Sequence, residues 1–238
     1  MTENTVIKKG LNAEDYVQLI KVFTLSLEGH REVMNSLNVF PVPDADTGTN
    51  MYISVKGIMD SLDNADPHHD LNVLSKDIAN YALLSAQGNS GLLIAQLFRG
   101  IHKGVSSSNI LGLSELAESL EQSYEYAFSS IHEPQEGTMI TVMRECAKIA
   151  RKYLDTKNSD FKKALEAISS RAKSAVEETK GQMELLKQAD VIDSGAYGFS
   201  VMLEAAHNCV ESDQNGNVNL RVDGTNSFIP QIPNYYSP

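Results

Sequence analysis

Five stretches of the chain carry apolar residues three or four positions apart, the spacing that places them on one face of an α-helix. Between Pro134 and Pro230 there is no proline to interrupt such helices. Asn12 and Ser159 are the expected N-caps of the first and the fourth stretch. The pattern therefore predicts an all-α domain of about eight amphipathic helices. The five stretches are 16–27, 116–128, 140–154, 161–172 and 199–210.

One segment has the alternating pattern of a β-strand. Val218, Leu220 and Val222 alternate with other residues just after a turn-forming Asn-Gly pair. The surrounding stretch is poor in charge and rich in proline near its end. We therefore expect one domain, 1–211, followed by a linker or C-terminal arm, 212–238, that lies outside the core.

The charge of the chain excludes some classes of partner. Its net charge is −11, and no basic stripe is present to neutralise phosphates, so nucleic acid is not an expected partner. A nucleotide bound with magnesium is compatible with this charge, because acidic residues can hold the metal. No apolar stretch approaches the roughly 18 residues of a membrane span. The polar residues 1–10 lack the apolar core of a secretory signal, which favours the cytoplasm.

The cysteines and a histidine pair have simple interpretations. Cys146 and Cys209 lie in helical patterns and their spacing fits no zinc motif, so we expect buried thiols in a reducing compartment. His68 and His69 stand between two aspartates, but the polar segment around them predicts a solvated interhelical loop and not a metal site.

The segment LNVFPVPDADTGTNM carries the most informative chemistry of the chain. Pro41 and Pro43 fix φ and bias the residues before them toward extended geometry, so the preceding helix is expected to end near Asn38. Asp44 and Asp46 follow two positions apart, and in extended geometry their side chains point the same way. Two converging carboxylates repel each other unless a cation lies between them, and magnesium suits such a site.

The residues after this acidic pair have the composition of a helix start. Thr47, Gly48, Thr49 and Asn50 are expected to leave backbone N–H groups free, and the glycine lets a ligand approach the backbone closely. Free N–H groups favour an anion, and carboxylates for a metal beside amides for phosphate suit a magnesium nucleotide. The alternative is that Asp46 or Thr47 only caps the helix after a proline-rich turn, and the residues alone do not decide between the two.

This loop resembles the signature of the dihydroxyacetone kinase L-type family in the form found in bacterial fatty acid kinases, N-V-aromatic-P-V-P-D-G-D-T-G-T-N-M. The resemblance implies that Asp44 and Asp46 are catalytic carboxylates that bind magnesium. Asn38 stands where the dihydroxyacetone kinase branch has a third metal-binding aspartate, so its amide oxygen is a further expected ligand. The clear departure is Ala45, where the family has glycine. A left-handed φ at this position would strain the loop by about 1 kcal/mol.

Three further segments match the family in the order in which it has them: QGNSG from Gln87, QEGTMIT from Gln135 and VIDSGAYG from Val191. Each segment alone is also compatible with a polar helix start or turn. The resemblance implies roles in phosphate binding for the first, in lining the nucleotide and its base for the second, and in closing over the nucleotide for the third. The nucleotide-binding residues so implied are Thr47, Gly48, Thr49, Asn50, Asn89, Ser90, Gly91, Gly137, Thr138, Met139, Asp193, Ser194 and Gly195.

Two positive charges of the family are missing from these segments. Gln87 replaces the usual arginine of the phosphate loop, and near the third segment only Lys187 offers a positive charge where one branch has a nucleotide-contacting arginine. Both departures are expected to weaken contacts with phosphate.

The resemblance covers residues 12–211 and implies an eight-helix antiparallel barrel with ATP and a pair of Mg²⁺ ions at one end. Phosphoryl transfer depends on positioning and on neutralisation of charge, and the sequence has residues for both but no evident acceptor pocket or general base. The implied function is ATP- and magnesium-dependent transfer to an acceptor presented by a partner protein, first of all a fatty acid carboxylate on a fatty-acid-binding protein.

Other functions and assemblies stay open at this point. They are phosphorylation of dihydroxyacetone or a related glycerone on a dihydroxyacetone-binding partner subunit, a non-catalytic nucleotide-binding regulatory subunit, a magnesium-dependent phosphohydrolase, and assembly as a homodimer.

Overall fold

The computed structural model describes residues 9–63, 70–155, 160–214, 216–222 and 227–233. Within this part of the chain the secondary structure is helical apart from four short strands. The helices are α1 (Ala13–Ser36), α2 (Thr47–Leu62), α3 (Leu71–Ser85), α4 (Gly88–Val105), α5 (Leu113–Ser130), α6 (Met139–Leu154), α7 (Phe161–Gln182), α8 (Glu184–Ala189) and α9 (Ser194–Cys209). The strands are β1 (Gly10–Leu11), β2 (Leu111–Gly112), β3 (Val210–Ser212) and β4 (Val218–Leu220).

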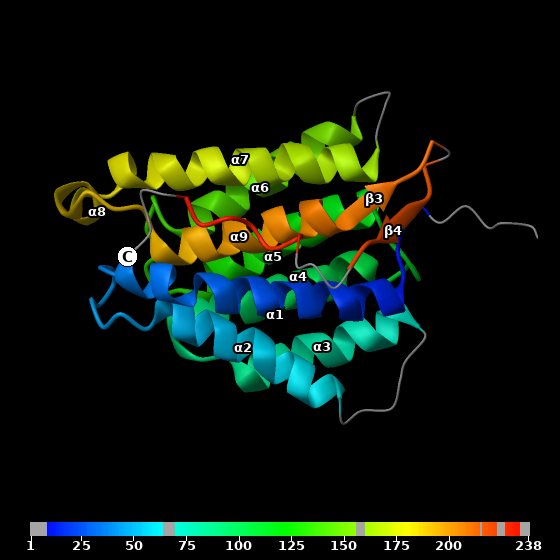
Figure 1. The fold of residues 1–238 in the computed structure, drawn as a ribbon, viewed down its shortest axis with the longest axis horizontal. Coiled ribbons are helices and arrows are strands. Elements are labelled where there is room, and N and C mark those ends of the chain that lie inside the picture. Colours follow the sequence, from blue (N-terminus) through cyan, green and yellow to red (C-terminus); the bar gives the residue numbers. More distant parts are fainter. Residues whose placement is uncertain (1–8, 64–69, 156–159, 215, 223–226, 234–238) are drawn as a thin grey trace, which may run out of the picture.

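The long helices form a closed antiparallel ring (Figure 1). Each of α1 to α6 packs against the next helix, α7 packs against α9, and α9 packs back against α1. The chain reverses direction at each connection, so α2, α4, α6 and α9 all begin at the same end of the barrel. The predicted all-α, eight-helix antiparallel barrel is confirmed, and the short α8 is an addition that the periodicity did not indicate.

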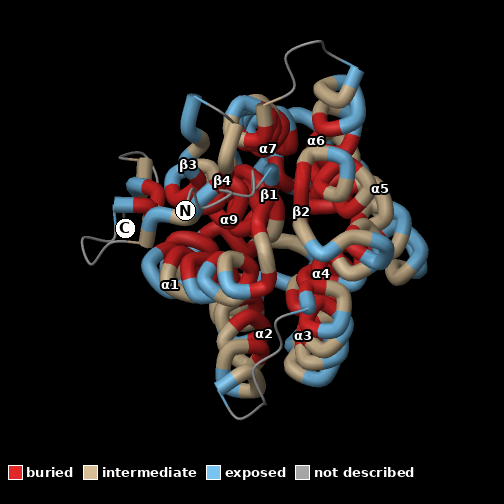
Figure 2. Tube along the Cα trace, turned by 90° about the vertical axis from the view of Figure 1, so that its right-hand side faces the viewer, coloured by how far each residue is buried: buried red, intermediate tan, exposed pale blue. Residues whose placement is uncertain are grey.

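The two strand pairs close the opposite end of the ring, which faces the viewer in Figure 2. Strand β1 pairs antiparallel with β2, and β3 pairs antiparallel with β4. Buried residues fill the centre of the ring and the exposed ones lie on its rim. The cysteines are free and buried within this core, as expected. None of the described helices has the length and apolar character needed to cross a membrane.

Small residues let α4 and α5 approach each other closely. A Cβ atom added to Gly100 would lie 2.1 Å from Oγ of Ser123, and one added to Gly104 would lie 2.1 Å from Oγ of Ser119. The Ser123 hydroxyl also donates to the carbonyl of Leu97 at 3.0 Å. Because packed interiors leave no room for even a methyl group here, this helix pair is fixed in its register.

The helix caps agree in part with the sequence. Asn12 caps α1 as predicted, with a capping box in which its side chain and that of Asp15 each accept the other's backbone N–H. Helix α7 is capped by Asp160, whose carboxylate accepts the N–H of Lys163. The predicted cap Ser159 lies outside the described residues, as do His68 and His69.

The segment after α9 packs on the barrel, which the sequence did not predict. The predicted strand is present as β4, but Val218 and Phe228 are 1% and 2% exposed and belong to the hydrophobic core. The carbonyl of Phe228 also accepts a hydrogen bond from the amide of Asn208 at 3.1 Å. The prediction that 212–238 lies outside the core is therefore wrong for these residues, because apolar side chains in a charge-poor segment gain from burial.

A buried histidine ties this last segment to the ring. His30 on α1 is 1% exposed, and its Nε2 lies 2.8 Å from the carbonyl oxygen of Pro230. Since a carbonyl can only accept, Nε2 carries the hydrogen, and Nδ1 accepts from the hydroxyl of Tyr197 on α9 at 2.8 Å. The imidazole of His30 is thus neutral, and both of its nitrogens are hydrogen-bonded. Burial lowers the pKa of His30.

Protonation of His30 is expected to link stability to pH. The unfolded chain, with a histidine pKa of about 6.5, binds this proton more readily than the folded one. The stabilisation is complete above about pH 6.5 and is lost as pH falls through the lowered pKa of the folded state. We expect His30→Gln to lower the free energy of unfolding by about 1–2 kcal/mol in mild alkali. Toward acid, the variant should lose less of its stability than the wild type does.

Denaturant unfolding across this pH range measures both effects. His132→Gln, a change at an exposed histidine, serves as the control and should follow the wild type. Equal loss of stability toward acid in wild type and His30→Gln would contradict the assignment.

Candidate functional site

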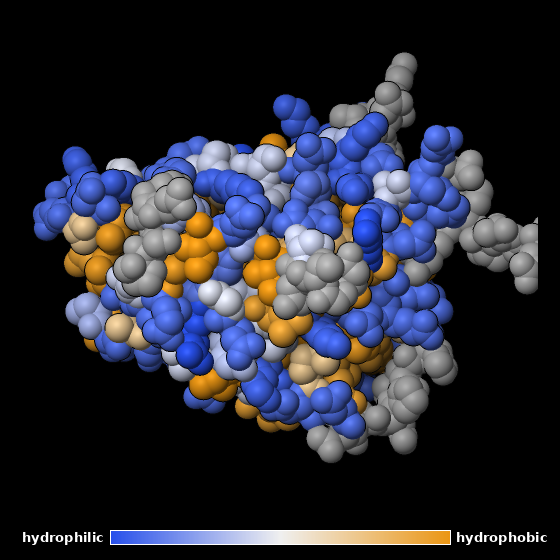
Figure 3. All heavy atoms as spheres, viewed as in Figure 1, coloured by the Kyte–Doolittle hydropathy of each residue, from blue (hydrophilic) through white to orange (hydrophobic). Residues whose placement is uncertain are grey.

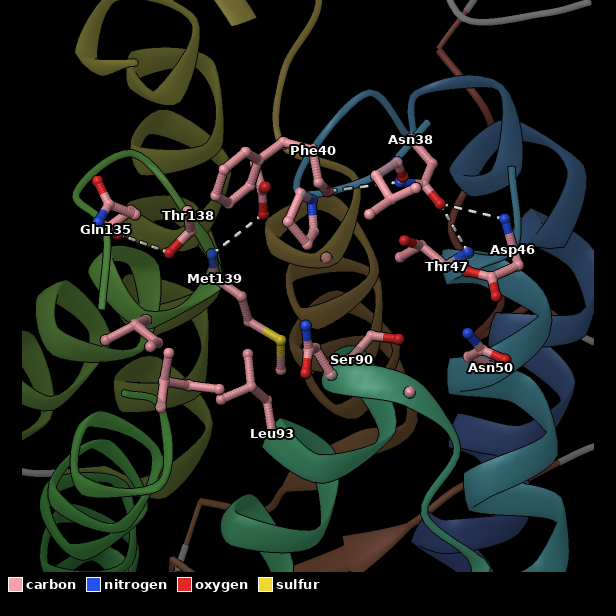
Figure 4. A pocket seen from close by; sticks show the side chains of 18 of the residues that line it. Asn38, Phe40, Asp46, Thr47, Asn50, Ser90, Leu93, Gln135, Thr138 and Met139 are labelled. Atoms are coloured by element: carbon pink, nitrogen blue, oxygen red, sulfur yellow. Dashed lines mark hydrogen bonds between the residues drawn. The ribbon is translucent and has the colours of Figure 1, made fainter. Parts of the chain in front are cut away.

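A cavity of about 410 Å³ opens at the end of the barrel where α2, α4, α6 and α9 begin. Its walls come from the loops before these helices and from their first turns (Figure 4). It thus joins all four segments that the sequence singled out. The predicted site residues that line it are Asn38, Asp44, Asp46, Thr47, Asn50, Asn89, Ser90, Thr138, Met139, Asp193 and Gly195.

Other predicted residues lie behind the cavity wall, where they pack. A Cβ atom on Gly48 would lie 2.2 Å from the carbonyl oxygen of Arg31, so glycine lets α2 start against α1. Ser194 is buried and its hydroxyl donates to the carbonyl of Met34 at 2.5 Å. The residues that do not line the cavity are Gly48, Thr49, Gly91, Gly137 and Ser194.

The amide of Asn38 binds the backbone of the acidic loop, the segment that carries Asp44 and Asp46. Asn38 is 6% exposed, and its Oδ1 accepts the backbone N–H groups of Asp46 and Thr47, each at 3.1 Å. Its Nδ2 donates to the carbonyls of Phe40 and Val42 at 3.4 and 3.1 Å. The oxygen required for metal binding is therefore engaged by two N–H groups, and we do not retain Asn38 in the metal-ligand set.

Ala45 adopts the left-handed conformation that the family's glycine would take without strain, with φ of 56°. Asp46 follows with a helical φ of −119° and ψ of −6°. This left-handed then right-handed sequence turns successive N–H groups toward one point, a nest that suits an anion or a carbonyl oxygen. In this chain the nest holds Oδ1 of Asn38. The alanine costs about 1 kcal/mol relative to an unstrained residue.

Asp44 and Asp46 are left without protein partners. Asp44 is exposed and Asp46 is half-buried, and among the described residues neither carboxylate forms a hydrogen bond or an ion pair. Asp46 occupies the N-cap position of α2 and yet makes no capping bond. Two free carboxylates at one cavity fit magnesium, which takes one or two carboxylates and completes its shell with water and phosphate oxygens. No group of three or more His, Cys, Asp or Glu side chains that could hold a metal is found anywhere among the described residues, so the candidate metal site has two carboxylates and no further such ligand.

The free backbone N–H groups belong to α4 and less to α2. The N–H of Thr47 is bound by Asn38 and that of Thr49 by Asn35, so the prediction of free amides at α2 is wrong for these two residues. At α4, Gln87 makes no side-chain capping bond. The N–H groups of Gly88, Asn89 and Ser90 find no acceptor in the described part of the chain. Within the described chain, none of the first three N–H groups of α4 is bound, whereas α2, α6 and α9 each have at least one of theirs bound, so an anion is favoured at α4.

The cavity wall mixes polar and apolar side chains. Figure 4 shows Asp46, Thr47 and Asn50 on one side, Thr138 and Gln135 on the other, and Ser90 between them. The cavity residues that the sequence did not predict are Phe40, Pro41, Val42, Gly88, Leu93, Ile131, Glu133, Gln135 and Ile140. Leu93 and Ile140 lie within helices, where nothing in the sequence distinguishes them from core residues, and Phe40, Pro41 and Val42 belong to the loop that carries Asp44 and Asp46. The cavity thus combines apolar side chains with a small number of polar groups, as ligand sites commonly do.

Asp193 connects the starts of α6 and α9. It is 7% exposed, and its Oδ1 accepts the N–H of Met139 at 3.1 Å and that of Ala196 at 2.7 Å. Its own N–H donates to the hydroxyl of Thr179 at 3.0 Å. Burial raises the pKa of Asp193 to about 6, against the opposing effect of the two N–H bonds.

The loop before α6 is held by a charged pair outside the cavity. Glu136 forms a two-pronged ion pair with Arg144, which lowers the pKa of Glu136. The same carboxylate accepts from the hydroxyl of Thr141 at 2.9 Å, and that hydroxyl accepts the N–H of Gly137 at 3.0 Å. Glu136 therefore shapes the loop that presents Thr138 to the cavity.

The closed ring of helices and its end-on cavity define the chain as an all-α barrel protein with a ligand pocket at the helix starts. A family model described as the DAK2 domain matches residues 41–208, and the chain belongs to this family. The predicted dihydroxyacetone kinase L-type resemblance is thereby confirmed.

Curated relatives are longer than this chain. Protein YloV of Bacillus subtilis is 30% identical over 194 residues, which cover 82% of this chain and 35% of the relative. An uncharacterized protein of Mycoplasma genitalium is 32% identical over 202 residues, which cover 82% of this chain and 36% of the relative. The chain thus spans about a third of these relatives' length.

Solved structures share the fold. The dihydroxyacetone kinase of C. freundii in its native form matches with a TM-score of 0.60 and 18% identity, covering 87% of this chain and 36% of that one. The same kinase in complex with AMP-PNP and Mg²⁺ matches with a TM-score of 0.61, 18% identity and the same coverage.

The raised pKa of Asp193 gives a test of its part in the fold. Its ionised form is disfavoured by folding, so its stabilisation is complete below about pH 4 and is lost as pH rises through about 6. We expect Asp193→Asn, which keeps an acceptor oxygen, to be more stable than wild type at neutral pH and equal to it in acid. Asp193→Ala should lose about 1–2 kcal/mol relative to wild type in acid and less at neutral pH, where it also lacks the buried charge. Thermal unfolding of the variants checks this, and a destabilised Asp193→Asn at neutral pH would contradict it.

Proposed function

We propose that the chain is the ATP-binding part of a kinase, which transfers a phosphoryl group from magnesium-bound ATP to an acceptor presented by a partner protein. The observation that carries this proposal is one cavity lined both by Asp44 and Asp46, whose carboxylates have no partner among the described residues, and by the start of α4, whose N–H groups are open. Family membership supports it, and so does the fold shared with a kinase solved with AMP-PNP and Mg²⁺.

In this proposal, different residues of the cavity bind the metal, the phosphates and the base. Asp44 and Asp46 hold one or two Mg²⁺ ions, and the metal neutralises phosphate charge when it is bound. The N–H groups of Gly88 to Ser90, with the side chains of Asn89 and Ser90, bind phosphate oxygens. The apolar side chains of Leu93, Ile131 and Ile140 receive the base. A net charge of −11 does not oppose this arrangement, because the metal supplies the positive charge locally.

The acceptor is proposed to come from another protein. The cavity offers no histidine, lysine or tyrosine to activate a hydroxyl or carboxylate among its described lining residues. The fatty acid kinase form of the acidic loop favours a fatty acid carboxylate on a fatty-acid-binding protein, in the cytoplasm. Dihydroxyacetone on a partner subunit is the second candidate, since the solved neighbour is a dihydroxyacetone kinase.

The first test concerns the carboxylates. Asp44→Ala and Asp46→Ala should each weaken binding of Mg-ADP at least tenfold, about 1.4 kcal/mol, and leave the melting temperature of the free protein nearly unchanged. Neither side chain packs in the core. Isothermal titration calorimetry with Mg-ADP, and with ADP plus a chelator, measures the difference. Asp63→Ala, at the exposed end of α2, is the control. Undiminished binding in both variants would refute the site.

The second test concerns the acceptor. The isolated chain should form almost no acyl phosphate from labelled ATP and free fatty acid, because positioning of the two reactants can account for roughly 7–11 kcal/mol of barrier reduction. Adding an acyl-loaded binding protein, with the further domains of the longer relatives where these are needed, should restore transfer. Rapid turnover by the isolated chain on a free small molecule would instead favour a self-contained kinase or a phosphohydrolase.

A further inference from the structure

Helix α2 begins differently from the other helices that have an Asp or Asn at the N-cap. At α1, α3, α7 and α9 the N-cap side chain accepts a backbone N–H from the first turn of its own helix. At α2 the N-cap position holds Asp46, which is chemically able to do the same, and its carboxylate makes no such bond. The capping residues of the other four helices are Asn12, Asp70, Asp160 and Asp193.

The missing bond is supplied by Asn35, near the end of the neighbouring helix α1. Its Oδ1 accepts the N–H of Thr49 at 3.1 Å, and its Nδ2 donates to the hydroxyl of Thr49 at 3.1 Å. Thr49 is the third residue of α2, the position that an N-cap side chain normally serves. The second bond fixes which end of the Asn35 amide faces the N–H.

The backbone of Asp46 turns its side chain away from this amide. Its ψ is −6°, whereas the capping aspartates Asp70, Asp160 and Asp193 have ψ of 118°, 133° and 125°. Asn38 holds the Asp46 backbone in this conformation by binding the N–H groups of Asp46 and Thr47. The carboxylate is consequently part of the cavity wall.

We propose that Asn35 is a positioning residue, which caps α2 in place of Asp46 and so keeps the Asp46 carboxylate available for Mg²⁺. The inference rests on the proposed function, in which Asp46 binds the metal. A carboxylate that caps its own helix has an oxygen engaged by an N–H group, and that oxygen is weaker as a metal ligand. An amide at position 35 also caps without adding a third negative charge beside Asp44 and Asp46.

A double-mutant cycle in the presence of a chelator tests, without any metal, whether Asp46 replaces Asn35 as the cap of α2 when Asn35 is removed. Without Asn35, the N-cap side chain of Asp46 can take up the Thr49 N–H, so Asn35→Ala alone should lower the melting temperature only slightly. In the Asp46→Ala background no replacement exists, and the same change should lower it by about 2–4 °C. Asn12→Ala, which removes an ordinary cap at the far end of α1, should give the same loss in both backgrounds. If Asn35→Ala lowers the melting temperature equally in the two backgrounds, Asp46 does not replace Asn35 as the cap.

Calorimetry then tests the consequence for the metal. Asn35→Ala should weaken Mg-ADP binding roughly fivefold, the equivalent of one helix cap, and leave binding of ADP with chelator unchanged. Asn12→Ala should change neither. Unaltered Mg-ADP affinity in Asn35→Ala would overturn the positioning role. If the wild type binds ADP equally with and without Mg²⁺, the proposed function fails, and the chelator cycle still decides whether Asn35 and Asp46 compete for the same N–H.

Discussion

A closed ring of antiparallel helices must bring half of its helix starts to the same end, and this constraint governs the rest of the molecule. Here the starts of α2, α4, α6 and α9 meet around one cavity. Each start carries unpaired N–H groups and a partial positive charge. A strongly acidic chain thereby acquires a local region that attracts anions, without a cluster of lysines or arginines.

The side chains around the cavity decide which of these N–H groups remain open. Asn38 and Asn35 accept the N–H groups of Thr47 and Thr49 at the start of α2. Asp193 accepts those of Met139 in α6 and Ala196 in α9. The start of α4 has no such capping side chain among the described residues. Helix α4 therefore offers more open N–H groups than the other three helix starts, in the same cavity as the free carboxylates. Which N–H groups are capped, and not how many helices start here, decides where in the cavity an anion is favoured.

The sequence allowed prediction of the helices and of the acidic loop, because both depend on local patterns. Periodic apolar residues indicate a buried face wherever the partner helix lies, and two prolines with Asp44 and Asp46 restrict the backbone directly. Asn35 was not predicted, since a polar residue within α1 gains its role only from the position of α2 beside it. Leu93 and Ile131 look like core residues for the same reason. Phe228 was placed outside the core because its burial depends on a groove formed by distant helices.

The bond between His30 and Tyr197 joins residues 167 positions apart and lies where the first and last long helices meet. A ring closed at such a seam depends on contacts between residues far apart in the sequence, and it closes only after α9 has left the ribosome. Until then the acidic loop lacks α9 and Asp193 as neighbours, so nascent chains hold an incomplete pocket. The cavity is consequently complete only after α9 has been synthesised, and a ligand that contacts all four helix starts can bind only chains whose barrel has already closed.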